Sequence, residues 1–279
     1  MYKKILVPLD ISELSKVALP YAEQLAGRLG SEIILLSVSE SAEAQDYHKH
    51  QMHVETIINA TKHNAERYLE KPEVREIKVQ SVVLVGHPAE EIIDYADKED
   101  IDLIVMATHG RSGIGRWTLG SVVDKVMRAT NRPVALIRAK GARPDVREKG
   151  ILNKALVPLD GSKEGEAVIP YIEELASGLK AEVLLLQVGP PKADTEDYLE
   201  KVRGRLEGKG ITTRFEVRAG DAAGEIIKLA DEIDADVVAM STHGRSGIGR
   251  WALGSVAERV LNAGNTPLLL VRAPGANTD

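Results

Sequence analysis

The sequence contains no cysteine among its 279 residues, which excludes disulfide bonds, thiolate metal sites and a cysteine nucleophile. Aromatic residues make up only 4%, so the core must be built from Val, Ile, Leu and Ala, a composition typical of buried parallel strands. The net charge is −6, which argues against sequence-independent binding of nucleic acid. No apolar run approaches the roughly 18 residues of a membrane-spanning helix, and no signal-peptide pattern is present. We therefore expect a cytoplasmic protein that neither binds nucleic acid nor inserts into a membrane.

The sequence does contain a long internal repeat. The segment "THGRSGIGRW" occurs at residues 108–117 and again, unchanged, at residues 242–251, and "KKILVPLD" near the N-terminus returns later as "NKALVPLD". Repetition over this length indicates duplicated domains rather than a solenoid of short units. We predict a first domain over residues 1–140, a second over residues 151–273, and a linker over residues 141–150.

Within each copy, strands are expected to alternate with helices. Ser12 is a candidate N-cap, and Pro88 is expected to open a helix. The alternation indicates a parallel sheet with helices on both faces. In the first copy the spacing of apolar residues predicts strands at residues 4–9, 32–38, 77–85, 102–107 and 133–138, and helices at residues 12–29, 42–70, 88–98 and 121–129. The second copy repeats this order through residues 267–272, with a shorter second helix at about residues 194–207.

Two strand ends carry the residues best suited to a ligand. The first strand ends in "VPLD", which places Asp10 beyond its carboxyl end, and the fourth runs into the glycine loop, which leads through Gly120 into a helix. Open α/β sheets bind ligands at such ends, where the strand order reverses. The N–H groups of a helix start, the close approach that glycine allows, and the side chains of Arg111 and Arg116 all favour an anion. The pattern predicts a phosphate at the loop and a hydroxyl-bearing sugar at Asp10.

Two common phosphate motifs are absent. Gly110 and Gly115 have the glycine spacing of a P-loop, but Arg116 and Trp117 follow instead of Lys and Ser/Thr. The turn after the first strand reads "DISELS" rather than G-x-G-x-x-G. The sequence therefore favours neither a P-loop NTPase nor a Rossmann dinucleotide domain.

The same motifs resemble those of the universal stress protein family. The segments "ATHGRSGIGRWTLGSV" and "STHGRSGIGRWALGSV" are similar to the phosphate loop of that family, as are the "ILVPLD" opening and the closings "NRPVALIR" and "NTPLLLVR". The resemblance covers nearly the whole chain. It implies two tandem doubly wound α/β domains, each with a five-stranded parallel sheet of strand order 3-2-1-4-5. The family's nucleotide-binding loop reads Gly-x2-Gly-x9-Gly-Ser/Thr, and here Ala107 and Ser241 replace the first glycine.

The resemblance implies a stress-response or signalling protein that binds ATP or AMP, with or without Mg²⁺. Asp10 and Asp160 would bind the ribose or the adenine edge. The last strands, residues 133–138 and 267–272, would pair within the chain, and a homodimer and an unidentified protein partner are further expectations. The adenine pocket would be lined by Pro8, Val38, Pro158 and Val188. The phosphate site would comprise Ala107, Gly110, Arg111, Gly120, Ser121 and Val122, and in the second copy Ser241, Gly244, Arg245, Gly254, Ser255 and Val256.

Other functions stay open at this stage. One or both halves could be ligand-free interaction modules, which the replacements at Ala107 and Ser241 favour. The chain could also hydrolyse ATP slowly, although it offers no Walker lysine and no obvious catalytic dyad. We expect no dedicated catalytic residue and no resident metal.

Several side chains also have alternative roles. Asp10 could cap the following helix as well as bind a sugar. His109 and His243, beside the glycine loops, could act as general bases or only position the loop. The cluster of His48, His50 and His53 could bind a metal or lie on a solvated helix face.

Overall fold

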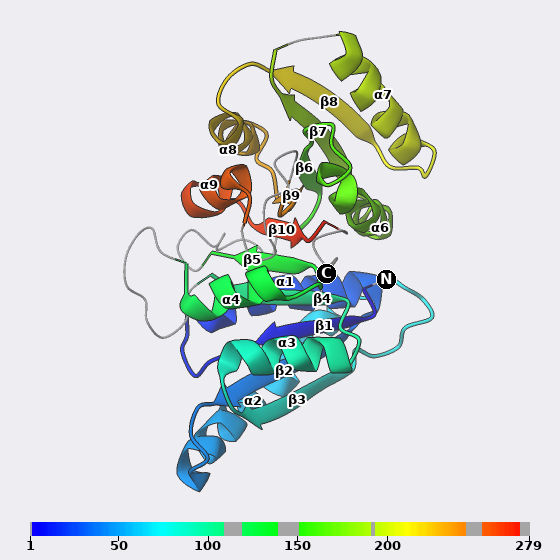
Figure 1. The fold of residues 1–279 in the computed structure, drawn as a ribbon. Helices are drawn as coiled ribbons and strands as arrows, with labels where there is room; N and C mark the ends of the chain where they lie inside the picture. Colours follow the sequence, from blue (N-terminus) through cyan, green and yellow to red (C-terminus); the bar gives the residue numbers. More distant parts are fainter. Residues whose placement is uncertain (1, 109–118, 139–150, 191–192, 244–252, 274–279) are drawn as a thin grey trace. The chain divides into compact units, whose positions relative to one another are not determined.

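The computed structural model describes residues 2–108, 119–138, 151–190, 193–243 and 253–273. The chain divides into two compact units, Met1–Ile151 (unit 1) and Leu152–Asp279 (unit 2) (Figure 1). Each unit is an open α/β sheet of five parallel strands, which confirms the predicted fold class.

Unit 1 has the strand order β3-β2-β1-β4-β5, so β1 lies at the centre between β2 and β4. In the register of the sheet, Ile5 of β1 lies beside Ile33 of β2 and Leu103 of β4. The elements of unit 1 are β1 (Lys4–Pro8), η1 (Ser15–Ala18), α1 (Leu19–Leu29), β2 (Glu32–Ser39), α2 (Ala44–Glu66), β3 (Val79–Val85), α3 (Pro88–Lys98), β4 (Leu103–Ala107), α4 (Ser121–Ala129) and β5 (Val134–Ile137).

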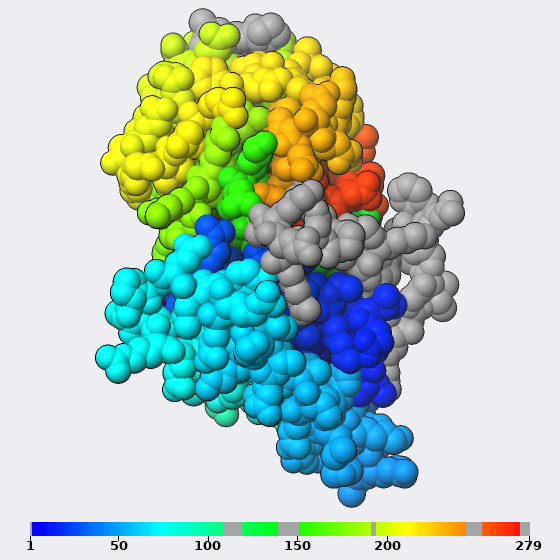
Figure 2. All heavy atoms as spheres, turned by 180° about the vertical axis from the view of Figure 1, so that it is seen from behind, coloured from blue at the N-terminus to red at the C-terminus, as the bar shows by residue number. Residues whose placement is uncertain are grey.

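Helices cover both faces of this sheet. On one face α1 contacts α2, and on the other α3 contacts α4 (Figure 1). The central strands are consequently buried from both sides, and Ile5, Leu6, Ile104 and Val105 are fully buried. This double burial explains why the strands are continuous aliphatic runs rather than alternating patterns. The first turns of α2, light blue in Figure 2, stand out from the surface of unit 1.

The first predicted helix differs from the observed structure. Instead of one helix over residues 12–29, a 3₁₀ turn (η1) precedes α1, which begins at Leu19. Pro20 explains the interruption, because it has no N–H to donate to a carbonyl one turn earlier and is tolerated only in a first turn. The α2 helix is also shorter at both ends than residues 42–70. In contrast, α3 and α4 have the predicted bounds.

Unit 2 repeats the same topology, with strand order β8-β7-β6-β9-β10. On one face α8 contacts α9, while α6 and α7 lie on the other (Figure 1). Its elements are β6 (Lys154–Pro158), η2 (Gly165–Val168), α6 (Ile169–Leu179), β7 (Glu182–Val188), α7 (Ala193–Glu207), β8 (Thr213–Arg218), α8 (Ala222–Glu232), β9 (Val237–Ser241), α9 (Ser255–Ala263) and β10 (Leu268–Val271).

The amino ends of the sheets are fixed by an aspartate in each unit. Asp102 Oδ2 accepts hydrogen bonds from the N–H groups of Lys3 (2.7 Å) and Lys4 (3.0 Å). In unit 2, Asp236 Oδ2 accepts the equivalent pair from Asn153 (2.8 Å) and Lys154 (3.0 Å). These carboxylates therefore hold the start of the central strand, and they lie at the end of the sheet opposite to Asp10 and Asp160.

Candidate functional site

The strand order creates a crevice at the carboxyl end of each central strand. The helix that follows β1, α1, lies on one face of the sheet, and the helix that follows β4, α4, lies on the other face (Figure 1). Because β1 and β4 are neighbours in the sheet, helices that follow them on opposite faces leave space between the two strand ends. Open α/β sheets bind ligands in this space. In unit 2, β6 and β9 are neighbours in the same way, and the helices that follow them lie on opposite faces of the sheet.

In unit 1 this crevice is a cavity of about 310 Å³. Its volume lies at the lower end of the roughly 300–1,000 Å³ usual for small-molecule sites. The structure brings together every described residue that the sequence predicted for this site: Pro8, Asp10, Val38, Ala107, Gly120, Ser121 and Val122. Gly110 and Arg111 lie outside the described residues.

Unit 2 has an equivalent cavity of about 250 Å³. The predicted residues again line it: Pro158, Asp160, Val188, Ser241, Gly254, Ser255 and Val256. Gly244 and Arg245 lie outside the described residues. The two units thus place corresponding residues around corresponding cavities.

The start of α4 presents main-chain donors to the unit 1 cavity. Gly120 is the N-cap residue in an extended conformation, without a side-chain cap, and the first helical hydrogen bond runs from the Asp124 N–H to the Gly120 carbonyl (3.0 Å). The N–H groups of Ser121, Val122 and Val123 precede that bond, and no described residue accepts a hydrogen bond from them. Together with the helix dipole they favour an anion. In unit 2, α9 begins in the same way, with the first bond from Glu258 to Gly254 (2.8 Å).

The structure changes the role expected for Gly120 and Gly254. The Gly120 N–H donates to the Thr108 carbonyl (3.1 Å), and the Gly254 N–H donates to the Thr242 carbonyl (2.8 Å). A Cβ atom at Gly254 would lie 2.9 Å from that carbonyl oxygen, closer than side chains normally approach. These glycines therefore allow two backbone segments to meet, and the donors left for a ligand begin at the following serine.

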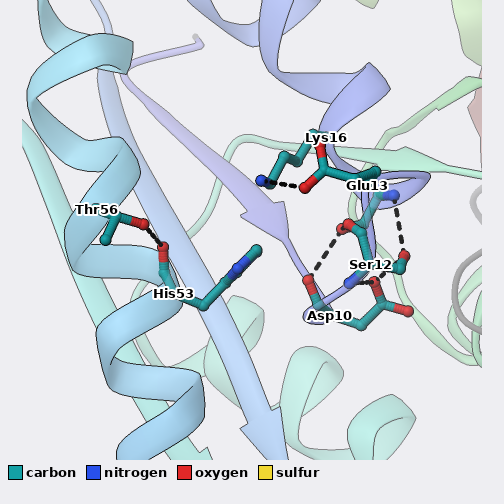
Figure 3. Close-up of polar contacts among 7 residues, drawn as sticks. Asp10, Ser12, Glu13, Lys16, His53 and Thr56 are labelled. Atoms are coloured by element: carbon teal, nitrogen blue, oxygen red, sulfur yellow. Dashed lines mark hydrogen bonds and ion pairs between the residues drawn. The ribbon is translucent and has the colours of Figure 1, made fainter.

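Each site aspartate also holds the turn that follows its strand (Figure 3). Asp10 Oδ1 accepts hydrogen bonds from the Ser12 N–H (2.9 Å) and the Ser12 hydroxyl, and Ser12 Oγ accepts one from the Ser15 N–H (3.4 Å). Asp160 and Ser162 repeat this arrangement, with distances of 3.0 and 2.6 Å to Asp160 Oδ1. The serine therefore holds the turn before the helix and the aspartate orients the serine, while the aspartate still lines the cavity. The alternative that Asp10 caps the helix is wrong, because neither η1 nor α1 has a side-chain cap and Asp10 bonds to the turn instead.

Several cavity residues were not predicted from the sequence. Ser15, Glu40, Pro88, Ile92 and His50 also line the unit 1 cavity. His50 appeared in the sequence only as part of the cluster "HKHQMH". A signal for its burial was available, because His50, Val54, Thr61 and Ala65 follow the spacing of the buried face of α2. The described residues contain no group of three side chains that could hold a metal.

The neighbouring His53 lies close to Asp10, beside an ion pair between Lys16 and Glu13 (2.6 Å) (Figure 3). Burial lowers the pKa of His53 below its ordinary value, and the positive charge of Lys16 lowers it further, while Glu13 and Asp10 oppose the shift. Its Nε2 atom is buried and has no hydrogen-bond partner among the described residues. These surroundings therefore favour the neutral form of His53 beside Asp10.

His243 lies at the unit 2 cavity, beside the glycine loop. Its ring Nδ1 is 3.1 Å from the Thr242 hydroxyl, and its N–H donates to Ser241 Oγ (3.4 Å). These contacts are compatible with the positioning role, which stays a prediction together with the general-base role. His109, its counterpart, lies outside the described residues.

Fold and cavity together define each unit as a doubly wound α/β domain with a cavity at the switch point of the sheet. The chain matches the model of the Universal stress protein family over residues 1–138 and 152–272. The chain therefore belongs to the universal stress protein family, and it carries two tandem copies of the family's domain.

Individual relatives agree with this assignment. Universal stress protein MJ0577 of Methanocaldococcus jannaschii is 31% identical over 159 residues, which cover 51% of this chain and 98% of that protein. Universal stress protein Slr1230 of Synechocystis is 24% identical over 300 residues, covering 97% of this chain and 100% of that protein. The crystal structure of a universal stress protein from Archaeoglobus fulgidus has the same fold, with a TM-score of 0.77 at 21% identity, over 98% of this chain and 99% of that one. Among the described residues, no helix has both the length and the apolar character needed to cross a membrane.

Proposed function

We propose that each unit binds an adenine nucleotide, ATP or AMP, in the cavity at its switch point. The observation that carries the proposal is that hydrogen-bond donors and an acceptor line the same cavity. Ser121, Val122 and Val123, whose N–H groups have no described acceptor, and the carboxylate-bearing Asp10 all line it. A nucleotide has matching groups, because its phosphates accept hydrogen bonds and its ribose and base donate them.

Apolar residues of the same cavities suit the flat base. Pro8 and Val38 line the unit 1 cavity, and Pro158 and Val188 line the unit 2 cavity. In this proposal the base lies against these side chains, the ribose reaches the aspartate, and the phosphates reach the helix start. The arginines Arg111 and Arg245 would add charge from the glycine loops.

The bound nucleotide would act as a signal rather than as a substrate. The sequence supplies no Walker lysine, so we expect at most slow ATP hydrolysis. The domain limits 1–140 and 151–273, with a linker at 141–150, stay proposals. We also propose a role in stress response or signalling in the cytoplasm. Pairing of the two last strands within the chain and formation of a homodimer are proposals as well.

The decisive experiment is calorimetric titration of the nucleotide-free full chain with ATP, ADP and AMP, with and without Mg²⁺. We expect saturable binding at two sites per chain. Titration with inorganic triphosphate is the matched control, because it offers the anion without adenosine and should bind more weakly. Absence of heat at millimolar nucleotide would reject the proposal and favour a ligand-free interaction module. Phosphate release well above background would instead favour a hydrolase.

A further inference from the structure

The cavities of the two units differ in the acidic side chains that line them. In unit 1, Glu40 lines the cavity together with Asp10. Among the described residues that line the unit 2 cavity, Asp160 alone has a carboxylate. The proposed function gives Asp10 and Asp160 the same role, so the additional carboxylate of unit 1 is left without one.

The sheet topology places Glu40 on the side of the cavity away from the helix start. Glu40 directly follows β2, which pairs with one edge of β1. The start of α4 lies beside the end of β4, because the Gly120 N–H donates to the Thr108 carbonyl, and β4 pairs with the other edge of β1. Neighbouring strands lie about 4.8 Å apart, so the ends of β2 and β4 are separated by roughly 10 Å. The carboxylate of Glu40 and the N–H groups that suit an anion therefore lie on opposite sides of the central strand.

Alternate residues of β2 connect the proposed base site with Glu40. Leu36, Val38 and Glu40 all line the cavity, and Leu36 lies beside Pro8 in the register of the sheet. The proposed function places the base against Pro8 and Val38. Glu40 is the next cavity residue along this segment, and two residues span no more than about 7 Å. Glu40 therefore lies within reach of the nucleoside and away from its 5′ phosphates.

The side chain of Glu40 is available to a ligand. It is exposed, and no described residue forms a hydrogen bond or an ion pair with it. A carboxylate only accepts hydrogen bonds, and the two ribose hydroxyls of a nucleotide can donate them. In doubly wound domains that bind dinucleotides, an acidic residue binds the ribose 2′-hydroxyl, whereas an arginine accommodates a phosphate at that position. A carboxylate at this place thus favours a ribose with free hydroxyls.

Unit 2 has a proline at the position of Glu40. β6 pairs with β7 in the same register as β1 with β2, and β7 continues into Gly189 and Pro190. Pro190 therefore corresponds to Glu40. It is exposed, carries no charge, and is absent from the described lining of the unit 2 cavity. The two cavities thus share the helix start and the aspartate but differ in charge beside the second strand of each sheet.

We propose that Glu40 makes unit 1 selective for nucleotides whose ribose hydroxyls are free. Its carboxylate accepts a hydrogen bond from a ribose hydroxyl and repels a phosphate attached at that position. The inference rests on the proposed nucleotide binding. Unit 2, which has Pro190 instead, does not make this distinction. Both units would then bind a 5′-nucleotide, and a nucleotide with an additional 2′- or 3′-phosphate would bind mainly to unit 2.

The test compares AMP with adenosine 2′,5′-bisphosphate and adenosine 3′,5′-bisphosphate by calorimetry; ATP and its 2′- and 3′-phosphorylated forms replace them if the chain binds ATP alone. The full chain carries Ser255→Pro, which removes the first main-chain donor of the unit 2 site, so that unit 1 is measured. At least one bisphosphate should bind about tenfold more weakly than AMP, as expected for a charge of nearly −2 held about 6 Å from a carboxylate in water. Because this repulsion is electrostatic and exposed, the difference should shrink as the salt concentration rises.

Glu40→Gln retains the shape of the side chain and removes its charge, so it should abolish most of this discrimination. The matched control is Glu43→Gln, which removes the same charge from an exposed residue that does not line the cavity and should leave the discrimination unchanged. The reverse experiment places Pro190→Glu in a chain carrying Ser121→Pro, where it should create the discrimination in unit 2.

Titrations with the 2′-deoxy and 3′-deoxy nucleotides identify the hydroxyl that Glu40 binds. The analogue that lacks this hydroxyl should bind equally to chains with Glu40 and with Glu40→Gln. Equal binding of AMP and both bisphosphates to unit 1, discrimination that persists in Glu40→Gln, or the same loss of discrimination in Glu43→Gln would overturn the inference while leaving the proposed function intact. A wild-type chain that binds neither ATP nor AMP would overturn both.

Discussion

Replacing Ser121 by proline tests whether the start of α4 binds the phosphates through its main chain. Ser121 is the first residue of the helix, its side chain is exposed, and no described residue accepts a hydrogen bond from its N–H. Proline is well accepted at this position because the missing N–H has no helical partner. Gly120 precedes it with φ −60° and ψ 141°, a conformation that a residue before proline readily adopts. The substitution should therefore remove a ligand donor and leave the fold nearly unchanged.

The expected magnitude follows from the charge of the ligand. A hydrogen bond to a charged group contributes about 1.5–3 kcal/mol, which corresponds to a roughly 10- to 150-fold change in the dissociation constant. The ring of proline also occupies the space of the lost hydrogen, so the loss should lie toward the upper end. The free energy of unfolding should change by no more than about 0.5 kcal/mol, as for other exposed positions.

The assay is the two-site titration with ATP. Ser121→Pro should weaken only the site in unit 1, and Ser255→Pro only the site in unit 2. Ser121→Ala is the matched control: it keeps the N–H and removes the hydroxyl, and it should cost only about 1 kcal/mol or less. Unchanged ATP affinity in Ser121→Pro, or an equal loss in Ser121→Ala, would refute main-chain binding at the helix start.

Two further predictions concern stability. In Gly27→Ser the new side chain of α1 would clash with the Ala65 carbonyl in α2, so we expect the free energy of unfolding in urea to fall by about 2–3 kcal/mol. The control is Ser177→Gly, the reverse change at the exposed equivalent position of α6, which should cost no more than about 1 kcal/mol. Similar losses in both variants would contradict the clash. The pKa of His53 in the folded chain lies below its unfolded value of about 6.5, so the unfolded chain binds the proton first as the pH falls. The folded state therefore loses stability as the pH falls through the unfolded pKa of about 6.5. His53→Gln should therefore gain stability relative to the wild type between about pH 7.5 and 5.5, and a pH-independent difference between the two proteins in urea unfolding would count against this explanation.

Local signals in the sequence were sufficient for much of the fold. The bounds of α3 and α4 were predicted correctly because proline at residue 88 and the glycine–serine pair at residues 120–121 are strong signals of a helix start. The error at α1 came from treating residues 12–29 as one periodic segment in spite of Pro20. The repeat itself was evident because the copies retain long identical runs.

The candidate site was predictable only in part. The strand ends and the helix start could be placed together from topology, since the carboxyl ends of neighbouring parallel strands meet at one edge. The carbonyl partner of the Gly120 N–H, Thr108, could not be predicted, because the contact joins residues twelve positions apart and depends on tertiary packing rather than on local sequence. The contact of His50 with the cavity depends on the packing of α2 against β2, which sequence spacing does not specify.

The two copies have diverged unequally, and this bears on function. From residue 108 to residue 122 the first copy differs from the second only at Thr118, which is Ala252 in unit 2. The lining of the cavities differs elsewhere, because His50 of α2 lines the unit 1 cavity and no described residue of α7 lines the unit 2 cavity. A loop that served only as a turn would not need the same arginines and tryptophan in both units, whereas a loop that binds the same anion would. A retained loop and helix start therefore favour the same anion in both units, and a loss of ATP affinity confined to unit 1 in Ser121→Pro and to unit 2 in Ser255→Pro would show that both helix starts bind it.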